Sequence, residues 1–272
     1  MYTMSEKKLR LGLVGKDVSK SDSPRMHGFI LKQMGVACEY ETFSVAMEGF
    51  DAAMRSLLGD FDGFNVTIPY KRDVMEYLNE VVDDAFDFGA VNTVVSATKK
   101  GYNTDGVGFM LMLKNAGVEV TNKKVLILGA GGAGRSTAAV LKRAGANVSM
   151  YRRNQTELQE TCDQLGVTAA ETPYGGGFDV VINSTGVGMH DTVGVSPVDK
   201  RVFAGTSVAI DLIYKPKTSA FLQLASETGL RTMNGEAMLF YQAYYADCLY
   251  LGKEPNAEEA KAYFVKYCAE NA

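Results

Sequence analysis

Short apolar runs alternate with longer amphipathic segments through the first hundred residues of the chain. The apolar runs predict strands at 9–15, 40–45 and 61–68, and the segments between them predict helices at 23–35 and 46–59. Strands that alternate with helices in this way are typical of an α/β unit with parallel strands. We therefore predict such a unit for the first part of the chain.

The stretch that follows predicts a short helix at 71–78 and a hairpin at 90–106, with its turn at 99–101. At the start of the first helix, Ser23 is the expected N-cap, because serine is a common cap and Pro24 suits the first helical position. These elements complete the first predicted unit.

The alternation resumes at 123–145, where an apolar strand leads through a glycine-rich loop into a helix. Apolar spacing predicts two further helices near the end of the chain, at 237–250 and 257–268. The boundary between the units is expected at 103–109. The later strands of the second unit are predicted at 147–153, 178–185, 207–214 and 231–235.

The glycine-rich loop has the spacing of a dinucleotide-binding motif. In "VLILGAGGAGRS", three glycines stand in the order G-x-G-x-x-G between a strand and a helix. Glycine allows the tight turn and lets backbone N–H groups approach a pyrophosphate at the helix N-terminus. The alternative is a tight turn without a ligand. The residues assigned to cofactor binding are Gly129, Ala130, Gly131, Gly132, Ala133 and Gly134.

The strand after this loop lacks the acidic residue of an NAD site. NAD-binding domains usually carry Asp or Glu about 20 residues after the motif, where it binds the ribose 2′-hydroxyl. Here the strand ends in Tyr151, Arg152, Arg153 and Asn154. Guanidinium groups suit a 2′-phosphate, so we predict NADP as the cofactor. The alternative is two solvated arginines at a strand end.

Composition narrows the class of protein. The 272 residues are 46% hydrophobic and 22% charged, as in ordinary globular proteins, and the net charge of −4 argues against nucleic-acid binding. The four cysteines form no CxxC pair, so neither a metal site nor a redox pair is expected. The sequence shows no membrane-length apolar stretch and no signal-peptide core near its start. We therefore expect a cytoplasmic protein.

Polar residues gather at the end of the third predicted strand. The stretch "GFNVTIPYKRDV" places Asn65 and Thr67 inside an apolar run and Lys71 two residues after a proline. A buried strand has no structural need for an amide, a hydroxyl and an ammonium at one end. These side chains are therefore candidates for a binding site.

Eight stretches together resemble the shikimate dehydrogenase family. In chain order they are "SKSDSPRMH", "NVTIPYK", "AVNT", "YNTDG", "GAGGAG", "VINSTGVGM", "DLIYKP" and "NGEAMLFYQA", and they run from about residue 9 to residue 242. The resemblance implies a substrate-binding and catalytic domain of residues 1–105, completed by C-terminal helices at 239–272. An NADP-binding Rossmann domain would span 106–238, with the substrate in a cleft between the domains.

The resemblance also implies a catalytic pair. A hydride moves between nicotinamide and a secondary alcohol only if a nearby group handles the proton of the oxygen. Lys71 is the candidate acid/base, and the resemblance implies that Asp105 is its partner and also binds the substrate. Burial would lower the pKa of the lysine and a nearby carboxylate would raise it. The alternative for Lys71 is a solvated residue in the first turn of a helix.

Further site residues follow from the same resemblance. Ser21 and Ser23 match the serines that hold the substrate carboxylate, although Ser23 also suits a helix cap. His27 matches a histidine that we interpret as structural. The residues matching contacts to ring hydroxyls or the lining of the site are Thr67, Asn92, Tyr214 and Gln242. Thr185, Gly235 and Met238 match the cofactor pocket.

Some positions depart from the family pattern. Lys20 stands where relatives often have histidine, and Gly186 follows Thr185 where serine or proline is usual. The run 152–154 reads Arg-Arg-Asn instead of Asn-Arg-Thr. A similar arginine pair occurs in quinate/shikimate relatives that accept either cofactor, so strict selectivity for NADP stays open.

The implied function is the reversible NADPH-dependent reduction of 3-dehydroshikimate to shikimate. A broader quinate/shikimate dehydrogenase is the main alternative, and the serine pair favours shikimate. A non-catalytic NADP-binding regulator and another two-domain Rossmann enzyme, such as a folate dehydrogenase, are further alternatives. The expected partner is a small-molecule substrate, with a homodimer left open.

Overall fold

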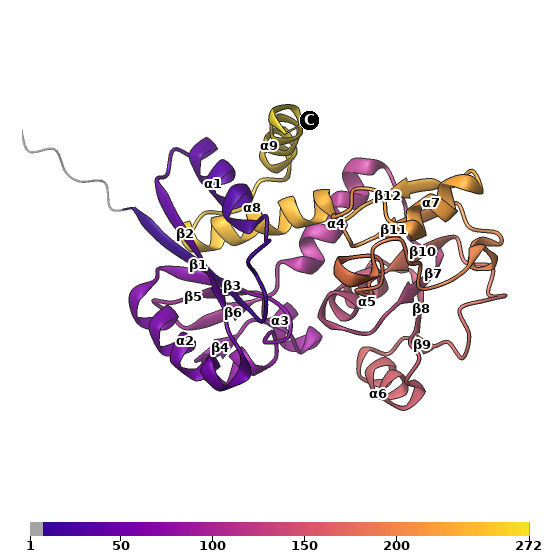
Figure 1. The fold of residues 1–272 in the computed structure, drawn as a ribbon, viewed down its shortest axis with the longest axis horizontal. Helices are drawn as coiled ribbons and strands as arrows, with labels where there is room; N and C mark the ends of the chain where they lie inside the picture. Colours follow the sequence, from indigo (N-terminus) through magenta and orange to yellow (C-terminus); the bar gives the residue numbers. More distant parts are fainter. Residues whose placement is uncertain (1–7, 272) are drawn as a thin grey trace, which may run out of the picture. The chain divides into compact units, whose positions relative to one another are not determined.

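The computed structural model describes residues 8–271 of the chain (Figure 1). These residues divide into two compact units. One consists of residues 8–104 and 240–271, and the other of residues 105–239. Each unit contains one six-stranded sheet and several helices. The predicted α/β class is confirmed.

The first unit contains the strands Leu9–Gly15 (β1), Cys38–Ser44 (β2), Gly63–Val66 (β3), Glu80–Val81 (β4), Thr93–Val95 (β5) and Lys100–Tyr102 (β6). Their order in the sheet is β2-β1-β3-β5-β6-β4. Strands β2, β1 and β3 are parallel, β5 is antiparallel to β3 and β6, and β4 is parallel to β6.

The carboxyl ends of β1 and β3 lie side by side because the two strands are parallel and in register up to Val14 and Val66. Beyond them, Thr67 N donates to Val14 O at 2.9 Å and Lys16 N donates to Ile68 O at 3.1 Å. The loop after β1 and the polar stretch after β3 therefore start from the same edge of the sheet.

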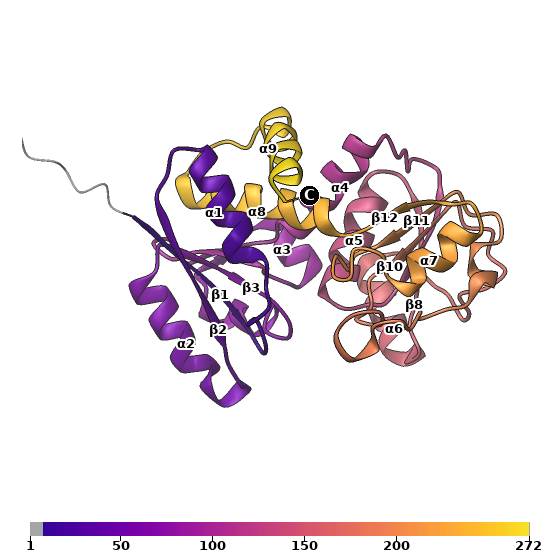
Figure 2. The ribbon, with the colours of Figure 1, turned by 45° about the horizontal axis from the view of Figure 1, so that its top comes forward.

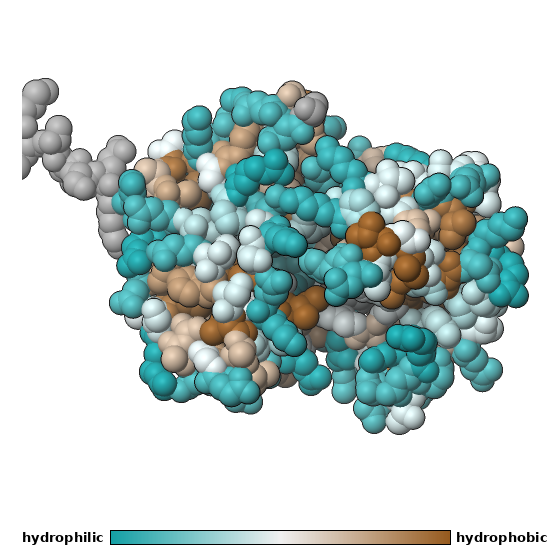
Figure 3. Space-filling view, viewed as in Figure 1, coloured by the Kyte–Doolittle hydropathy of each residue, from teal (hydrophilic) through white to brown (hydrophobic). Residues whose placement is uncertain are grey.

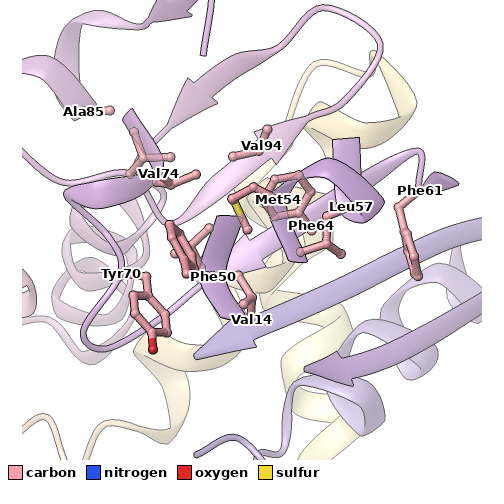
Figure 4. Close-up of a cluster of buried hydrophobic side chains, with 12 residues drawn as sticks. Val14, Phe50, Met54, Leu57, Phe61, Phe64, Tyr70, Val74, Ala85 and Val94 are labelled. Atoms are coloured by element: carbon pink, nitrogen blue, oxygen red, sulfur yellow. The ribbon is translucent and has the colours of Figure 1, made fainter. Parts of the chain in front are cut away.

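Helix Met47–Asp60 (α2) builds the core beside this edge (Figure 4). Its residues Phe50, Met54 and Leu57 recur every three or four positions, so they share one helix face and are buried. The Tyr70 ring stacks on Phe50 with centroids 4.3 Å apart, and its hydroxyl donates to Val45 O at 2.6 Å. Tyr70 thereby anchors the segment that carries Lys71.

The end of β3 differs from the prediction of a strand at 61–68. The strand stops at Val66, and Ile68 is 68% exposed before a cis Ile68–Pro69 peptide. Proline has no N–H to donate to a sheet ladder, so the strand could not continue through Pro69. The helix predicted at 71–78 is instead a 3₁₀ helix at Asp73–Tyr77.

Helix Ser23–Gln33 (α1) also begins differently from the prediction. The N-cap residue is Asp22, and Ser23 is the first helical residue, so the predicted serine cap is wrong. The Ser23 hydroxyl is hydrogen-bonded outside the helix end instead, as described below. Helix Asp83–Phe88 (α3) and strand β4 were not predicted, because elements of six and two residues show no clear period.

The second unit contains Lys124–Leu128 (β7), Asn147–Tyr151 (β8), Thr168–Ala169 (β9), Val180–Asn183 (β10), Val208–Asp211 (β11) and Arg231–Met233 (β12). They form a parallel sheet in the order β12-β11-β10-β7-β8-β9 (Figure 1), and Figure 2 shows β12, β11, β10 and β8 from a second side. This order is that of a dinucleotide-binding Rossmann sheet, with its switch point between β7 and β10. The Rossmann-type prediction is confirmed.

Helices Gly132–Arg143 (α5), Gln155–Leu165 (α6) and Ala220–Glu227 (α7) connect β7 to β8, β8 to β9 and β11 to β12, in keeping with the alternating pattern. Helix Asp105–Ala116 (α4) precedes β7. Two long helices follow, Glu236–Leu251 (α8) and Ala257–Glu270 (α9), close to their predicted bounds. Residues of α8 from Phe240 onward belong to the first unit.

Polar side chains cover much of the visible face of each unit, with apolar residues in small groups between them (Figure 3). Among residues 8–271, no helix combines the length and the apolar character needed to cross a bilayer. No group of three or more His, Cys, Asp or Glu side chains in the same part of the chain could hold a metal ion.

Candidate functional site

The glycine-rich loop joins β7 to α5 and has the backbone geometry of a phosphate loop. Gly129 has φ +104°, a conformation that side chains rarely allow, and α5 begins at Gly132 after Gly131 as N-cap. A Cβ on Gly134 would lie 2.6 Å from Ser184 Oγ and 2.8 Å from Gly129 O. The space around Gly131 is open, since no described atom outside its own residue and its two chain neighbours lies within 4 Å of its ideal Cβ position. Gly134 therefore serves packing, and Gly131 leaves room for a ligand.

The arginines after β8 differ in their surroundings. Arg152 forms an ion pair with Glu157, whereas the exposed Arg153 forms none with any residue in 8–271. Asn154 caps α6, because its Oδ1 accepts from Glu157 N and its Nδ2 donates to Glu157 Oε1 at 2.7 Å. Arg153 is thus the arginine with its full charge available to a phosphate.

The loops after β10 and β11 are tied together by a buried carboxylate. Asp211 Oδ1 accepts from Asn183 Nδ2 at 3.1 Å and from Ile213 N at 3.0 Å, and Oδ2 accepts from Ser219 Oγ at 2.5 Å. Burial raises the pKa of Asp211, against the lowering effect of these three donors. The network fixes the chain on both sides of the half-buried Tyr214.

Two of the predicted cofactor residues, Thr185 and Gly235, follow the carboxyl ends of β10 and β12 in the second sheet. The third, Met238, follows Gly235 by three residues. Thr185 N and Oγ1 both donate to Asn183 Oδ1, at 3.0 and 2.7 Å. Gly235 N donates to Ile213 O at 3.1 Å, and a Cβ there would lie 2.1 Å from Leu212 O, so only glycine fits. Met238 is buried at 7% exposure, in the first turns of α8.

Asn92 and Gln242 meet in the first unit although 150 residues separate them. Asn92 Nδ2 donates to Gln242 Oε1 at 3.4 Å, and Thr104 Oγ1 donates to the same oxygen at 3.2 Å. Asn92 Oδ1 accepts from Thr104 N and from Thr93 Oγ1, each at 2.9 Å. Asn92 and Gln242 are 3% and 7% exposed. The predicted amides therefore form one buried cluster.

We expect Asn92→Ala to lower the free energy of unfolding by about 1–3 kcal/mol, because it leaves the buried Thr104 N–H without its acceptor. Urea unfolding of the purified variant measures this value. Asn79→Ala is the matched control. Asn79 is exposed, so its loss should change stability by less than about 0.5 kcal/mol. Equal effects of the two substitutions would show that the Asn92 cluster contributes no special stability.

The two serines are connected to the same region through Tyr40. Ser21 Oγ donates to Ser23 Oγ at 3.1 Å, and the Ser23 side chain, as a neighbour of Tyr40, lowers the pKa that burial raises at this tyrosine. Tyr40 Oη donates to Asn65 Oδ1 at 2.8 Å. Asn65 Nδ2 in turn donates to Thr93 Oγ1 at 3.2 Å. We call the set Ser21, Ser23, Tyr40, Asn65, Thr93, Asn92, Thr104 and Gln242 the polar chain.

Sequence reasoning missed Tyr40 as part of this set. It assigned no role to Tyr40, and it named Asn65 as a candidate for a binding site without giving it a specific role. Both lie on neighbouring strands of the sheet, β2 and β3 flanking β1. The signal for Asn65 was its position inside an apolar run, whereas Tyr40 became visible only when the strands were placed together.

Thr67 and Lys71 lie where β3 ends. The Thr67 methyl group packs against Gly15, where a Cβ would lie only 2.5 Å from it. Lys71 is half-buried, and its backbone oxygen accepts from Val91 N at 2.7 Å. Asp105 is the first residue of α4 and is 7% exposed. The pairing of Lys71 with Asp105 stays a prediction.

Comparison with known proteins places the chain in a family. Residues 13–94 match the family described as the shikimate dehydrogenase substrate binding domain. A shikimate dehydrogenase (NADP(+)) from Caldanaerobacter subterraneus subsp. tengcongensis is 38% identical over 259 residues, which cover 89% of this chain and 91% of the relative. The chain belongs to the shikimate dehydrogenase family. Residues 74–228 also match the C-terminal domain of alanine dehydrogenase/PNT.

Other members of the shikimate dehydrogenase family agree with this assignment. The NADP(+) enzyme of Carboxydothermus hydrogenoformans is 37% identical over 263 residues, covering 92% of this chain and 94% of the relative. A chorismate mutase/shikimate 5-dehydrogenase fusion protein from Clostridium acetobutylicum has a structure with TM-score 0.89 and 33% identity, covering 97% of this chain and 98% of that chain. Shikimate 5-dehydrogenase from Thermus thermophilus, in complex with NADP(H) and shikimate, has TM-score 0.86 and 32% identity, covering 94% of this chain and 98% of that chain.

Proposed function

We propose that the protein catalyses the reversible reduction of 3-dehydroshikimate to shikimate by NADPH, a step of aromatic amino-acid biosynthesis. The polar chain of the first unit carries the proposal, because it gathers hydroxyl and amide groups suited to a small polyhydroxylated carboxylic acid. Relatives named shikimate dehydrogenase (NADP(+)) support it, as does the family member solved with NADP(H) and shikimate.

The substrate roles follow the positions of the polar chain. We assign the carboxylate to Ser21 and Ser23, whose hydroxyls meet at the start of α1. Asn92 and Gln242, with Thr67, would bind the ring hydroxyls. A buried amide without a partner is costly, so these residues would reject acids that lack the hydroxyls. Tyr214 is assigned to the lining of the site.

We assign the proton transfer to Lys71 and Asp105. When bound, NADPH supplies a hydride to the ketone carbon. Lys71 donates the proton that converts the carbonyl oxygen into the hydroxyl of shikimate, and it takes this proton back in the reverse direction. Asp105 orients the same hydroxyl. The proposed division of labour gives substrate binding and catalysis to residues 1–105 and 239–272, and cofactor binding to 106–238.

The second unit fits NADP in two respects. The open space at Gly131 and the start of α5 suit the pyrophosphate, since helix N-termini bind anions. The unpaired charge of Arg153 suits the 2′-phosphate, with Arg152 and Asn154 beside it. Thr185, Gly235 and Met238 are assigned to the nicotinamide end of the pocket.

Two glycine substitutions separate packing from cofactor binding. We expect Gly134→Ala to lower the free energy of unfolding by about 1–3 kcal/mol, because its Cβ overlaps Gly129 O and Ser184 Oγ. Gly131→Ala has room for its methyl group and an ordinary φ of −77°, so stability should stay within about 0.5 kcal/mol. Its KM for NADP+ should rise about tenfold, because the methyl group occupies the pyrophosphate approach. An unchanged KM for NADP+ in Gly131→Ala would contradict the assignment of this loop to pyrophosphate binding.

Initial rates with shikimate or quinate, each with NADP+ or NAD+, test the proposed function and its main alternative. We expect rapid turnover only with shikimate and NADP+, followed as the absorbance of the reduced nicotinamide. Comparable rates with quinate or NAD+ would support the broader quinate/shikimate dehydrogenase. Absence of turnover in protein that still binds NADP+ would support a non-catalytic regulator.

The oligomeric state and the cellular location of the protein are separate proposals from its reaction. We propose a cytoplasmic enzyme, in keeping with a biosynthetic NADPH-dependent reaction. A homodimer stays an open prediction. Sedimentation of the purified protein at several concentrations measures its oligomeric state.

A further inference from the structure

A histidine and an aspartate form a buried pair next to Tyr40 of the polar chain. His27 Nδ1 lies 2.6 Å from Asp247 Oδ1, and both side chains are 0% exposed. His27 comes from α1 and Asp247 from α8. The pair joins two helices whose residues are 220 positions apart. None of the roles assigned above uses it.

Packing alone does not explain this pair. His27 Nε2 and Asp247 Oδ2 are buried and have no hydrogen-bond partner among residues 8–271. Burial raises the pKa of Asp247, although His27 opposes the shift. Buried charged groups with unsatisfied atoms cost free energy, and apolar replacements of such pairs are often neutral or stabilising. A buried pair with this cost is a candidate for a role other than stability.

The pair is directly connected to the polar chain. The His27 ring stacks on the Tyr40 ring, with centroids 4.6 Å apart and planes inclined by 19°. Tyr40 Oη in turn donates to Asn65 Oδ1, and the Ser23 side chain is a neighbour that lowers the pKa of Tyr40. His27 also stands one helical turn after Ser23, so the two share a face of α1. The contact with Asp247 fixes the orientation of the His27 imidazole ring, and the Tyr40 ring stacks on the face of that imidazole.

We propose that Asp247 and His27 are positioning residues, which hold Tyr40 and thereby the Ser23 hydroxyl in the orientation that receives the substrate carboxylate. This inference rests on the proposed function. The pair acts through Tyr40 and does not touch the substrate. Its loss should therefore weaken the binding of the acid and leave cofactor binding unchanged.

The test compares two substitutions of Asp247 that differ in hydrogen bonding. Asp247→Leu removes the acceptor for His27, and KM for shikimate should rise about tenfold, which corresponds to about 1.4 kcal/mol. Asp247→Asn keeps an acceptor oxygen, so KM should stay within about threefold of the wild type. KM for NADP+ should be unchanged in both variants. If Asp247→Leu does not fold, the double variant His27→Phe/Asp247→Leu replaces it, because it buries no unpaired polar group.

A double-mutant cycle shows whether the pair acts through Tyr40. Tyr40→Phe removes the hydroxyl that donates to Asn65 and neighbours Ser23, and it should raise KM for shikimate by a similar factor. In Tyr40→Phe/Asp247→Leu the two effects should not add, since both break the same connection. Tyr244→Phe is the matched control on α8. It removes a buried hydroxyl bonded to Glu259, so stability should fall without a change in KM.

The outcomes separate this inference from the proposed function. An active wild type together with an unchanged shikimate KM in folded Asp247→Leu, or in the double variant that replaces it, would overturn the positioning role alone. Additive effects in the cycle would also overturn it. A wild type that does not oxidise shikimate would overturn the proposed function, and calorimetric Kd values for shikimate would then replace KM in the same comparison.

Discussion

Lys71→Met is expected to lower kcat for shikimate oxidation about a thousandfold, within the range typical of lost acid/base catalysis. Methionine keeps the length of the side chain and its packing but cannot exchange a proton. Binding contacts made by the other residues of the site persist, so KM for shikimate should change much less than kcat. Steady-state rates with saturating NADP+ measure both constants.

Lys32→Met is a suitable control for this experiment. Lys32 is an exposed lysine in the last turn of α1, in the same unit as Lys71. Its substitution should leave kcat within about twofold of the wild type, because surface substitutions away from a site have small effects. A Lys71→Met enzyme that retained kcat within about tenfold would contradict the assignment of Lys71 as the proton donor.

Arg153→Ala is expected to lower kcat/KM for NADP+ about a hundredfold, which corresponds to about 2.7 kcal/mol of lost charge-assisted hydrogen bonding. The value for NAD+ should change little, because NAD+ has no 2′-phosphate. The preference for NADP+ should therefore decrease by nearly the same factor. Initial rates over a range of each cofactor give the two constants.

Arg152→Ala provides the comparison for Arg153. Arg152 is paired with Glu157, so part of its charge is already neutralised. Its loss should reduce kcat/KM for NADP+ by a smaller factor than the loss of Arg153. A larger effect of Arg152→Ala would assign the 2′-phosphate to Arg152 instead of Arg153. Equal decreases of kcat/KM for NADP+ and NAD+ in Arg153→Ala would show that Arg153 does not bind the 2′-phosphate.

Local patterns predicted much of the fold because their causes lie close together in sequence. The glycine loop could be read from a strand, three spaced glycines and a helix that are neighbours in the chain, and the parallel sheet followed from the alternation of elements. The short elements β4, α3 and β9 were missed because segments of two to six residues are too short to show a periodic pattern of apolar positions. Ser23 was wrongly predicted as the cap, since it is the first helical residue and its hydroxyl accepts a hydrogen bond from Ser21 instead.

The candidate site was harder to predict, because its contacts join distant segments. Asn92 and Gln242 were identified by family resemblance, and only the fold showed that they share a hydrogen bond. Tyr40 gave no signal in the sequence. His27 was interpreted as structural, and its partner Asp247 lies on a helix that is far away along the chain. Such pairings depend on how strands and helices pack, which residue spacing does not specify.

Transfer of deuterium tests the central claim most directly. NADPH carrying deuterium at both hydrogen positions of the nicotinamide C4 is incubated with 3-dehydroshikimate and the purified protein, and the product is analysed by mass spectrometry and NMR. We predict shikimate with a single deuterium at the carbon that carried the ketone. Product without deuterium at that carbon, or no shikimate from protein that binds both ligands, would contradict the account.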